Sequence, residues 1–417
     1  MAGSPAAGKA DPGRRGYSGT AGTAGQGYRG PVPPEIFEPA ALGPVTLRNR
    51  IIKAATFEGA SPQGLVTDAL IDYHLRVAEG GVGMTTVAYL AVSPEGRTDR
   101  RCIHLRPDAA DGLARLTAAV HATGASVAAQ IGHAGPVANP KSNRAAALGP
   151  SRTITPLGSV VHAAGDDDIE RITGDFARGA ALAAAAGFDS IEIHLGHNYL
   201  LSAFLSPKLN RRTDRWGGTV ENRARFPRQV VAAVREAVGH TVAVTAKLNM
   251  ADGVDGGLWL DESLQVAARL EQDGHLDALE LTGGSSFANP MYLFRGEVPR
   301  REFAATLPPA VRLGFRLVGR RFMPEYPFEE AFFLPYARQF RAALSMPLIL
   351  LGGINRLDTI EQAVGEGLAF VAMARALLRQ PDLVNRLRDG TATESLCIHC
   401  NKCMPTIYRG THCVLAD

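Results

Sequence analysis

Two histidines and a tyrosine stand together directly after a short apolar run. The run 190–194 reads SIEIH, and His194, His197 and Tyr199 follow at its end. Imidazole and phenol groups donate hydrogen bonds, and a phenol can also deliver a proton. At the end of a strand, such a set can hold an anion or a carbonyl oxygen and protonate its ligand. One buried histidine usually satisfies only backbone groups, but three such side chains together favour a catalytic site.

Four of the five cysteines gather near residue 400 in the pattern C-x2-C-x2-C-x9-C. Four thiolates can ligate a [4Fe–4S] cluster, which is the interpretation we favour. They also suit tetrahedral zinc, with His399 and His412 as substitute ligands, and a metal-free segment is the third alternative. Cys102 stands alone and is predicted to be an ordinary loop or barrel residue. The predicted metal ligands are Cys397, Cys400, Cys403 and Cys413.

The elements that must position these residues alternate between strand-like and helix-like runs. The strand-like runs are 51–55, 83–88, 126–131, 190–194, 242–248, 278–281, 348–351 and 370–374. The helix-like runs are 68–78, 108–122, 167–186, 222–238, 260–273, 334–344, 357–366 and 380–388. Parallel crossovers need a helix's length of chain, and eight strands close a (β/α)8 TIM barrel. An open doubly wound sheet is the alternative, although no G-x-G-x-x-G opens a helix after a strand.

The chain from about residue 40 to 390 is longer than a typical barrel of roughly 250 residues. We therefore expect enlarged loops at 132–166, 195–221 and 283–333. Residues 1–30 are small, polar and glycine-rich, which predicts a disordered tail. The predicted barrel domain spans 31–392, and a short cysteine-bearing extension spans 393–417.

Composition excludes several classes of protein. Hydrophobic residues make up 46% of the 417 residues, so the chain can form a large core. A net charge of +3 is too small for a nucleic-acid-binding surface. No apolar run is long enough to span a membrane, and the first residues lack the apolar stretch of a secretion signal. We therefore expect a cytoplasmic protein, and a homo-oligomer is compatible with this composition.

Several motifs resemble the Old Yellow Enzyme family of FMN-dependent oxidoreductases. The resemblance covers about residues 35–390 in the family's order, and the cysteine-bearing tail resembles the 2,4-dienoyl-CoA reductase branch. The most specific motif is the run around His194. The motifs are LRNRIIKAATFEG, AVSPEGR, AAQIGHAG, GFDSIEIHLGHNYLLSAFLSPKLNRRTDRWGGTVENRARFP, LGGI and VAMARALLRQPDL.

The resemblance implies a barrel that binds one non-covalent FMN. Gln130 matches the residue at the flavin pyrimidine edge, and Lys247 stands where the family usually has an arginine near flavin N1. A cation there stabilises the negative charge of a reduced flavin, although lysine lacks the planar fork of arginine. Loops after the last two strands of barrels often bind phosphate through backbone N–H groups. The remaining cofactor-binding positions are Ala54, Ala55, Thr56 and Ala88 for the ring, and Gly352, Gly353, Ala374 and Arg375 for the phosphate.

The function implied is reduction of an activated C=C bond in an enone, enoate or dienoyl thioester. NADH or NADPH supplies the hydride, and flavin N5 passes it to the substrate. By resemblance, His194 and His197 hold the carbonyl oxygen, and Tyr199 protonates the α-carbon. The alternative is a flavin dehydrogenase or demethylase that passes electrons through the iron–sulfur cluster to an external acceptor. A non-redox barrel that binds a phosphate ligand is the alternative from a different class.

The long loop 292–333 is rich in arginine, phenylalanine and leucine. Residues 311–322 predict a basic amphipathic helix. This helix would serve as a lid that favours anionic or CoA-linked substrates, or as a membrane-surface contact. The alternative is a solvated helix that packs one face on the barrel. The arginines are at positions 295, 300, 301, 312, 316, 320 and 321.

Overall fold

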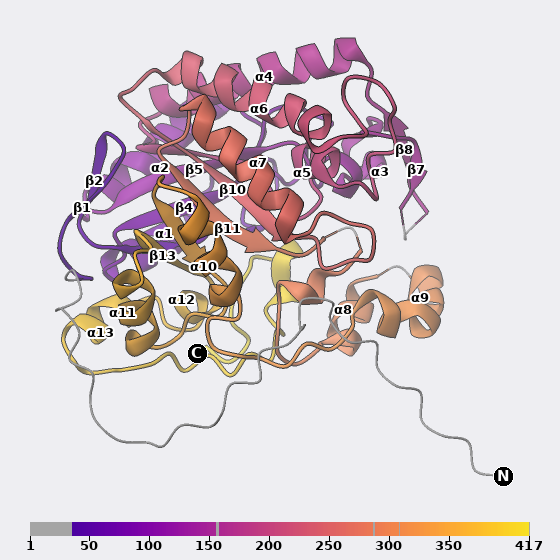
Figure 1. The fold of residues 1–417 in the computed structure, drawn as a ribbon. Coiled ribbons are helices and arrows are strands. Elements are labelled where there is room, and N and C mark those ends of the chain that lie inside the picture. Colours follow the sequence, from indigo (N-terminus) through magenta and orange to yellow (C-terminus); the bar gives the residue numbers. More distant parts are fainter. Residues whose placement is uncertain (1–35, 156–157, 287, 308, 417) are drawn as a thin grey trace, which may run out of the picture. The chain divides into compact units, whose positions relative to one another are not determined.

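The computed structural model describes residues 36–155, 158–286, 288–307 and 309–416. The tail predicted at 1–30 lies outside the described residues. Eight parallel strands form a closed barrel, which confirms the predicted (β/α)8 TIM barrel and excludes the open sheet. The strands follow one another around the barrel in chain order, and Figure 1 shows them surrounded by helices. They are β3 (Ile51–Lys53), β4 (Met84–Ala91), β5 (Ser126–Gly132), β9 (Ser190–Leu195), β10 (Ala243–Ala251), β11 (Ala278–Gly283), β12 (Leu348–Leu351) and β13 (Phe370–Met373).

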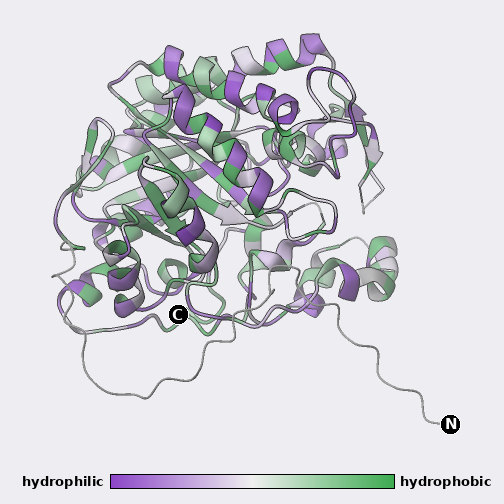
Figure 2. Ribbon diagram, viewed as in Figure 1, coloured by the Kyte–Doolittle hydropathy of each residue, from purple (hydrophilic) through white to green (hydrophobic). Residues whose placement is uncertain are grey.

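Helices surround the strands and turn an apolar stripe toward them. Figure 2 shows this division, with hydrophobic strands inside and hydrophilic outer helix faces. The helix predicted at 380–388 begins only at Leu383, because Pro381 disfavours helical backbone at Gln380, and a separate short helix that was not predicted ends at Arg379. The surrounding helices are α1 (Asp68–Glu79), α2 (Ala110–His121), α4 (Asp166–Ala185), α6 (Val220–Val238), α7 (Leu260–Asp273), α10 (Leu334–Ala343), α11 (Leu357–Gly365), α12 (Arg375–Arg379) and α13 (Leu383–Arg388).

A hairpin of β1 (Ala40–Leu42) and β2 (Val45–Leu47) closes one end of the barrel. Leu42 and Leu47 are fully buried in one cluster with residues that begin barrel strands, such as Ala243 and Phe370. This plug covers the amino-terminal ends of the strands. The opposite end, where the strands finish, is therefore the end open to chemistry.

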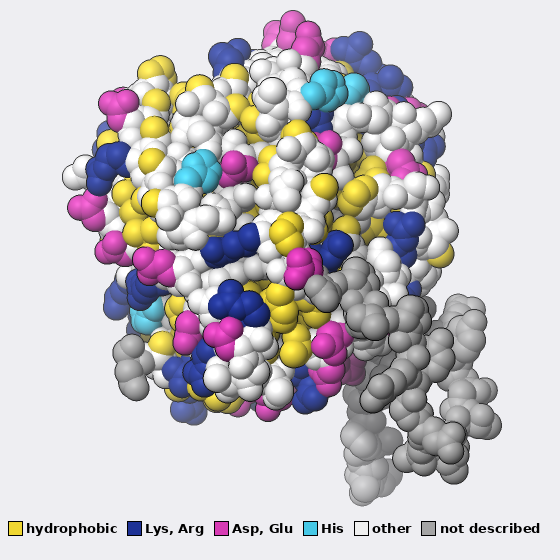
Figure 3. All heavy atoms as spheres, turned by 90° about the vertical axis from the view of Figure 1, so that its left-hand side faces the viewer, with side chains coloured by type: hydrophobic (Ala, Val, Ile, Leu, Met, Phe, Trp, Pro, Cys, Tyr) yellow, Lys and Arg dark blue, Asp and Glu magenta, His cyan; other side chains and the backbone are white. Residues whose placement is uncertain are grey.

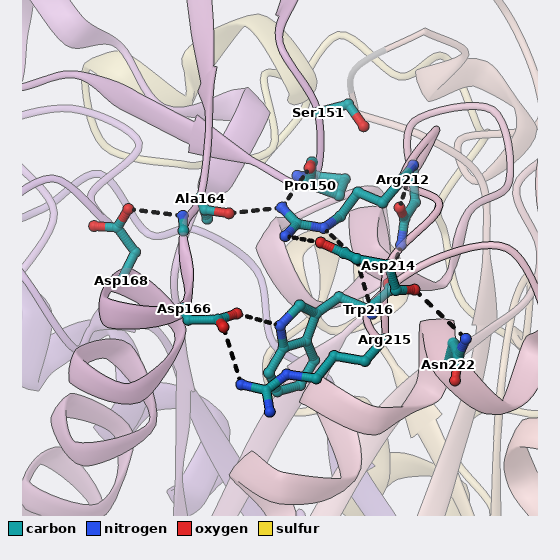
Figure 4. Close-up of polar contacts among 12 residues, drawn as sticks. Pro150, Ser151, Ala164, Asp166, Asp168, Arg212, Asp214, Arg215, Trp216 and Asn222 are labelled. Carbon is teal, nitrogen blue, oxygen red and sulfur yellow. Dashed lines mark hydrogen bonds and ion pairs between the residues drawn. The ribbon is translucent and has the colours of Figure 1, made fainter.

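The loop after β9 contains α5 (Leu200–Leu205) and a polar anchor near residue 216 (Figure 4). Trp216 Nε1 donates to Asp166 Oδ1 over 2.5 Å, which joins the loop to the first turn of α4. Arg212 donates to Asp214 and to the carbonyl oxygen of Ala164. The RTDRWGG part of the motif therefore has a structural role, since it fixes the loop that begins with His197.

The loop between β5 and α4 forms a small side sheet. It consists of β6 (Ala147–Gly149), β7 (Thr153–Ile154) and β8 (Val160–Ala163), with α3 (Pro140–Asn143) before it. Arg211, in the loop after β9, donates to Arg152 O between β6 and β7, so two enlarged loops support each other.

The loop after β11 contains α8 (Arg300–Thr306) and α9 (Pro309–Phe322), which confirms the helix predicted at 311–322. Phe315 is buried in a cluster with Met291, Met323 and Met404. Leu313 and Leu317, on the other face, are 67% and 87% exposed. The helix thus packs one face on its own loop and on the extension and leaves the other in solvent.

The cysteine-bearing extension is fastened to loops at the open end of the barrel. Thr411 N donates to Glu58 O over 2.6 Å, and Glu297 N donates to His399 O over 3.0 Å. Asn401 Nδ2 donates to Phe294 O over 2.6 Å. The extension therefore contacts both the loop after β3 and the loop after β11.

No described helix is long and apolar enough to cross a membrane. One face of the molecule, shown in Figure 3, carries basic and acidic side chains interspersed among neutral ones. Ion pairs between partly exposed side chains also occur, such as that of Arg338 Nε with Glu366 Oε2 over 2.7 Å.

Candidate active site

The structure brings His194, His197 and Tyr199 together at the open end of β9. The rings of His194 and His197 have centroids 5.1 Å apart, and those of His194 and Tyr199 are 4.5 Å apart. His194 is buried, and its Nδ1 has no hydrogen-bond partner among the described residues. A buried nitrogen without a partner is costly unless a ligand completes it.

Two neighbouring strands hold His197. Its backbone N–H donates to Asn249 Oδ1 on β10 over 3.0 Å, and its Nε2 lies 3.0 Å from Thr282 Oγ1 on β11. Both His197 and Asn198 have φ near 59°, in the left-handed region. The two side-chain contacts offset the cost of this backbone for residues other than glycine.

Both histidines are neutral. Burial lowers the pKa of His194 well below its usual range, and the neighbouring His197 and Lys247 lower it further. Burial lowers the pKa of His197 to about 3, with Lys247 adding to the effect. Neutral imidazoles can still donate a hydrogen bond, so the pair can hold an oxygen atom without carrying a charge.

Lys247 lies in a buried set of polar side chains. Its Nζ lies 3.0 Å from Glu192 Oε1 and 2.5 Å from Glu280 Oε1. Gln130 Nε2 donates to Glu192 Oε1 over 2.6 Å. The structure thus brings the two predicted pyrimidine-edge residues together, and it adds two carboxyl groups.

The positions predicted to lie under the flavin ring also gather at this end. Thr56 Oγ1 accepts from Lys53 Nζ over 2.8 Å, and Ala88 N donates to Glu58 Oε1 over 3.0 Å. Ala54 N donates to Met373 O over 2.9 Å, which joins the ends of β3 and β13. Ala55, Ala88, Tyr89 and Tyr199 belong to one apolar cluster, so the ring positions adjoin the predicted proton donor.

The predicted phosphate residues lie on the adjacent loops after β12 and β13. Gly352 and Gly353 have φ of 118° and 75°, which disfavours other residues. A Cβ on Gly352 would lie 2.5 Å from the Phe333 ring, so aromatic packing also requires glycine there. Arg375 donates to Arg295 O over 2.9 Å and to Asn401. Its guanidinium thereby joins this loop to the extension, which the sequence did not indicate, while Ala374 precedes it at the end of β13.

The four cysteines of the extension are free thiols that line one pocket beside Arg375 and Asn401. Burial raises the pKa of Cys403 to about 11. No group of three or more His, Cys, Asp or Glu side chains in the described part of the chain is arranged to hold a metal ion. The structure therefore supports neither the zinc alternative nor the iron–sulfur prediction.

Sequence reasoning missed several residues that build this site. Glu280 sits between Leu279 and Leu281, in the middle of a strand that is buried throughout. A charged residue at such a position indicates a buried partner or a functional site, because burying an isolated charge costs much free energy. Other missed residues carry weaker signals, since only the closed barrel brings them to their partners. They are Lys53, Glu58, Asn249 and Thr282.

The fold is a closed (β/α)8 barrel whose candidate site lies at the open strand ends. A model of the NADH:flavin oxidoreductase / NADH oxidase family matches residues 35–280. The chain belongs to this family, as the resemblance to Old Yellow Enzyme predicted, and it is an NAD(P)H-dependent flavin oxidoreductase.

Known proteins agree with this assignment. The 4,4'-dithiodibutanoate disulfide reductase of Rhodococcus erythropolis is 61% identical, over 92% of this chain and 96% of that protein. The NADH oxidase of Thermoanaerobacter brockii is 30% identical over 88% of this chain. The chain spans about half of that longer relative, 53% of its length. An old yellow enzyme homologue from Zymomonas mobilis superposes with a TM-score of 0.70 at 21% identity, over 88% of this chain and 96% of that one, which shows the same fold.

Proposed function

We propose that the chain reduces a small oxygen-bearing electrophile at the open end of the barrel. The observation that carries this proposal is the cluster of His194, His197 and Tyr199, in which His194 Nδ1 is buried without a partner. Bound FMN supplies hydride transfer from NADH or NADPH to the acceptor. Ala54, Ala55, Thr56, Ala88, Gln130 and Lys247 would hold its ring, and Gly352, Gly353, Ala374 and Arg375 its phosphate.

The histidine pair would bind an oxygen atom of the acceptor through neutral N–H groups. Because both imidazoles are uncharged, each needs one proton on the nitrogen that faces the acceptor. Thr282 and Asn249 fix the orientation of His197 before any ligand arrives. Donors that are already oriented lose little entropy when the acceptor binds. They can therefore stabilise the negative charge that develops on the acceptor oxygen as the acceptor takes up electrons.

The first acceptor class is an organic disulfide that carries carboxylates. It is supported by the 61% identity with a relative named for reduction of 4,4'-dithiodibutanoate. A carboxylate offers oxygen atoms to the histidine pair. Two electrons and two protons convert the S–S bond into two thiols, and no carbon atom is protonated.

The second acceptor class is an activated C=C bond. The position of Tyr199 supports it, because the phenol ring lies 4.5 Å from His194 and 5.4 Å from Tyr89, measured between ring centroids. A phenol next to a bound carbonyl can donate its proton to the α-carbon while the β-carbon receives hydride.

Tyr199→Phe separates these two classes. With 2-cyclohexenone, loss of a general acid is expected to slow reoxidation of the reduced enzyme by about 10²–10⁴-fold. With 4,4'-dithiodibutanoate, reoxidation is expected to change little, because no carbon is protonated. Anaerobic stopped-flow absorbance measures both reactions, and free thiol confirms disulfide cleavage.

Tyr336→Phe is the matched control, since Tyr336 contacts Tyr292 away from the histidine pair. Wild-type enzyme that reduces neither compound would contradict the proposal. Equal slowing of both reactions by Tyr199→Phe would remove the proposed difference between the two classes.

A cluster bound by the cysteines is a separate proposal that rests on their shared pocket alone. Nothing in the described residues favours electron exit through it over the reductase function. Iron and acid-labile sulfide in anaerobically purified protein would support the cluster, and their absence would remove it.

A further inference from the structure

Three buried charged side chains on successive strands form one set inside the barrel. Lys247 on β10 contacts Glu192 on β9 and Glu280 on β11. Side-chain exposure is 2% for Lys247, 4% for Glu192 and 1% for Glu280. Strand pairing aligns Lys247 with Glu280 and also with His194. Lys247 and Glu280 therefore lie at the same height in the barrel as His194. We call Lys247, Glu192 and Glu280 the buried triad.

The charges of the buried triad do not balance if both carboxyl groups are ionised. One ammonium then faces two carboxylates, and the set carries one net negative charge. Lys53 on β3 also interacts with this set, but it has its own carboxylate, Glu58, 3.7 Å away. A net charge removed from water costs several kcal/mol, and two carboxyl groups that share one site do not both ionise readily.

Hydrogen bonding indicates which carboxyl group keeps a proton. Glu192 accepts from Lys247 with both oxygens and from Gln130 Nε2, so its charged form has more donors. Glu280 bonds to Lys247 and to the Glu192 side chain. A proton on Glu280 can be donated to Glu192. Burial raises the pKa of Glu280, and the charge of Glu192 raises it further.

Of the described groups beside the buried triad, Lys53 titrates closest to neutral pH, and its ammonium faces its own carboxylate, Glu58. His194 on β9 and His197 after it are held neutral by burial. β5 contributes the uncharged Gln130, and β12 contributes only apolar residues, Leu348–Leu351. Burial lowers the pKa of Lys53 to about 8, which makes Lys53 the other group to consider.

We infer that Glu280 is a positioning residue that retains a proton at neutral pH, so that the buried triad, whose Lys247 would face the pyrimidine edge of FMN, is electrically neutral. The flavin position rests on the proposed function. While the proton is held, Lys247 can stabilise the negative charge that a reduced flavin carries. Once Glu280 loses the proton, the triad becomes net negative and disfavours reduction.

A redox titration of the FMN-loaded protein tests this charge effect. Glu280→Gln keeps the shape and a neutral donor but cannot ionise. Its flavin midpoint potential is expected to match wild type at about pH 6 and to exceed it at about pH 9, where wild-type Glu280 has lost its proton. Glu280→Asp, which can ionise, is expected to restore the pH dependence, and Glu366→Gln on the outer surface is the matched control.

The outcomes separate this inference from the proposed function. A constant difference between Glu280→Gln and wild type across this pH range would overturn the inference, as would identical potentials throughout. Wild-type protein that retains no FMN would overturn the proposed function as well.

A second measurement needs no flavin. A carboxyl group whose pKa is higher in the folded state stabilises the fold below its unfolded value of 4.5, and this contribution is lost as the pH rises through about 8. The stability of wild type relative to Glu280→Gln is therefore expected to fall between these two pH values. Urea unfolding of the apoprotein measures it, and a pH-independent difference would contradict the retained proton.

Discussion

At the scale of single residues, His197 depends on partners from two other strands. Its position after β9 follows from local sequence, but its orientation is set by Asn249 and Thr282. Burial alone would let the imidazole rotate toward any available acceptor. The contact between Nε2 and Thr282 Oγ1 instead holds the ring in one orientation.

Thr282→Val keeps the volume of this side chain and removes its hydroxyl group. A net hydrogen bond of about 1 kcal/mol predicts roughly fivefold to tenfold weaker binding of an oxygen-bearing ligand. Titration of the oxidised, FMN-loaded enzyme with 4,4'-dithiodibutanoate, followed by flavin absorbance, measures this affinity. Thr282→Ser retains the hydroxyl group and is expected to bind normally. If serine weakens binding as much as valine does, packing and not the hydrogen bond supports His197.

At the scale of elements, the loop after β9 needs an anchor because it is long and carries catalytic candidates. Trp216 is 4% exposed and donates to Asp166 in the first turn of α4. Its ring also lies edge-on to Phe226 of α6, with centroids 6.4 Å apart. One side chain therefore ties the loop to two helices, as Figure 4 shows for the polar contact.

Trp216→Phe removes the hydrogen bond and preserves an aromatic ring. We expect a loss of about 1–2 kcal/mol in the free energy of unfolding, because the partner carboxylate is largely exposed and can be solvated. Urea unfolding measures this loss. Arg215→Gln, which removes an exposed ion pair to the same Asp166, is expected to cost less than about 0.5 kcal/mol. An equal loss in the free energy of unfolding for both variants would show that the hydrogen bond of Trp216 stabilises the fold no more than the exposed ion pair does.

The insertion and the extension illustrate a further point about elements. Periodicity predicted α9 correctly, because an amphipathic helix leaves a local pattern in the sequence. The same pattern does not say what covers the apolar face. The structure places Phe315 of α9 with Met404 of the extension, two residues about ninety positions apart in the chain.

At the scale of the whole molecule, the candidate flavin site draws its predicted positions from six of the eight barrel strands or the loops after them. Its predicted ring positions come from β3, β4, β5 and β10, and its predicted phosphate positions follow β12 and β13. A ligand that contacts so many strands binds the folded state and not the unfolded chain. Binding should therefore stabilise the entire barrel.

FMN at about 100 times its dissociation constant is expected to add about 2.7 kcal/mol of stability. For a domain of this size, that corresponds to a rise in Tm of about 3–5 °C. Thermal unfolding of the apoprotein with added FMN measures the shift. Riboflavin, which lacks the phosphate, is expected to stabilise less at the same concentration. Equal shifts would contradict the predicted role of Gly352, Gly353, Ala374 and Arg375.

The sequence by itself predicted eight strands that alternate with helices and the meeting of His194, His197 and Tyr199, while it left the open sheet as an alternative to the barrel. These features follow from hydrophobic periodicity and from the rule that parallel strands end at the same face, both of which are local or topological. The final helix begins later than predicted, because Pro381 keeps Gln380 out of the helical conformation, and the short helix before it was not predicted.

Only the tertiary structure decided which side chains share a site. Glu280 meets Lys247 because neighbouring strands align them, and Thr282 meets His197 across two strands. The cysteine-bearing extension lies against the loops after β3 and β11, although no pattern in its sequence specifies those partners. Barrel closure and strand register set these contacts, and both depend on residues far apart in the chain. The charge beneath the predicted flavin site is therefore a property of the folded barrel and not of any one motif.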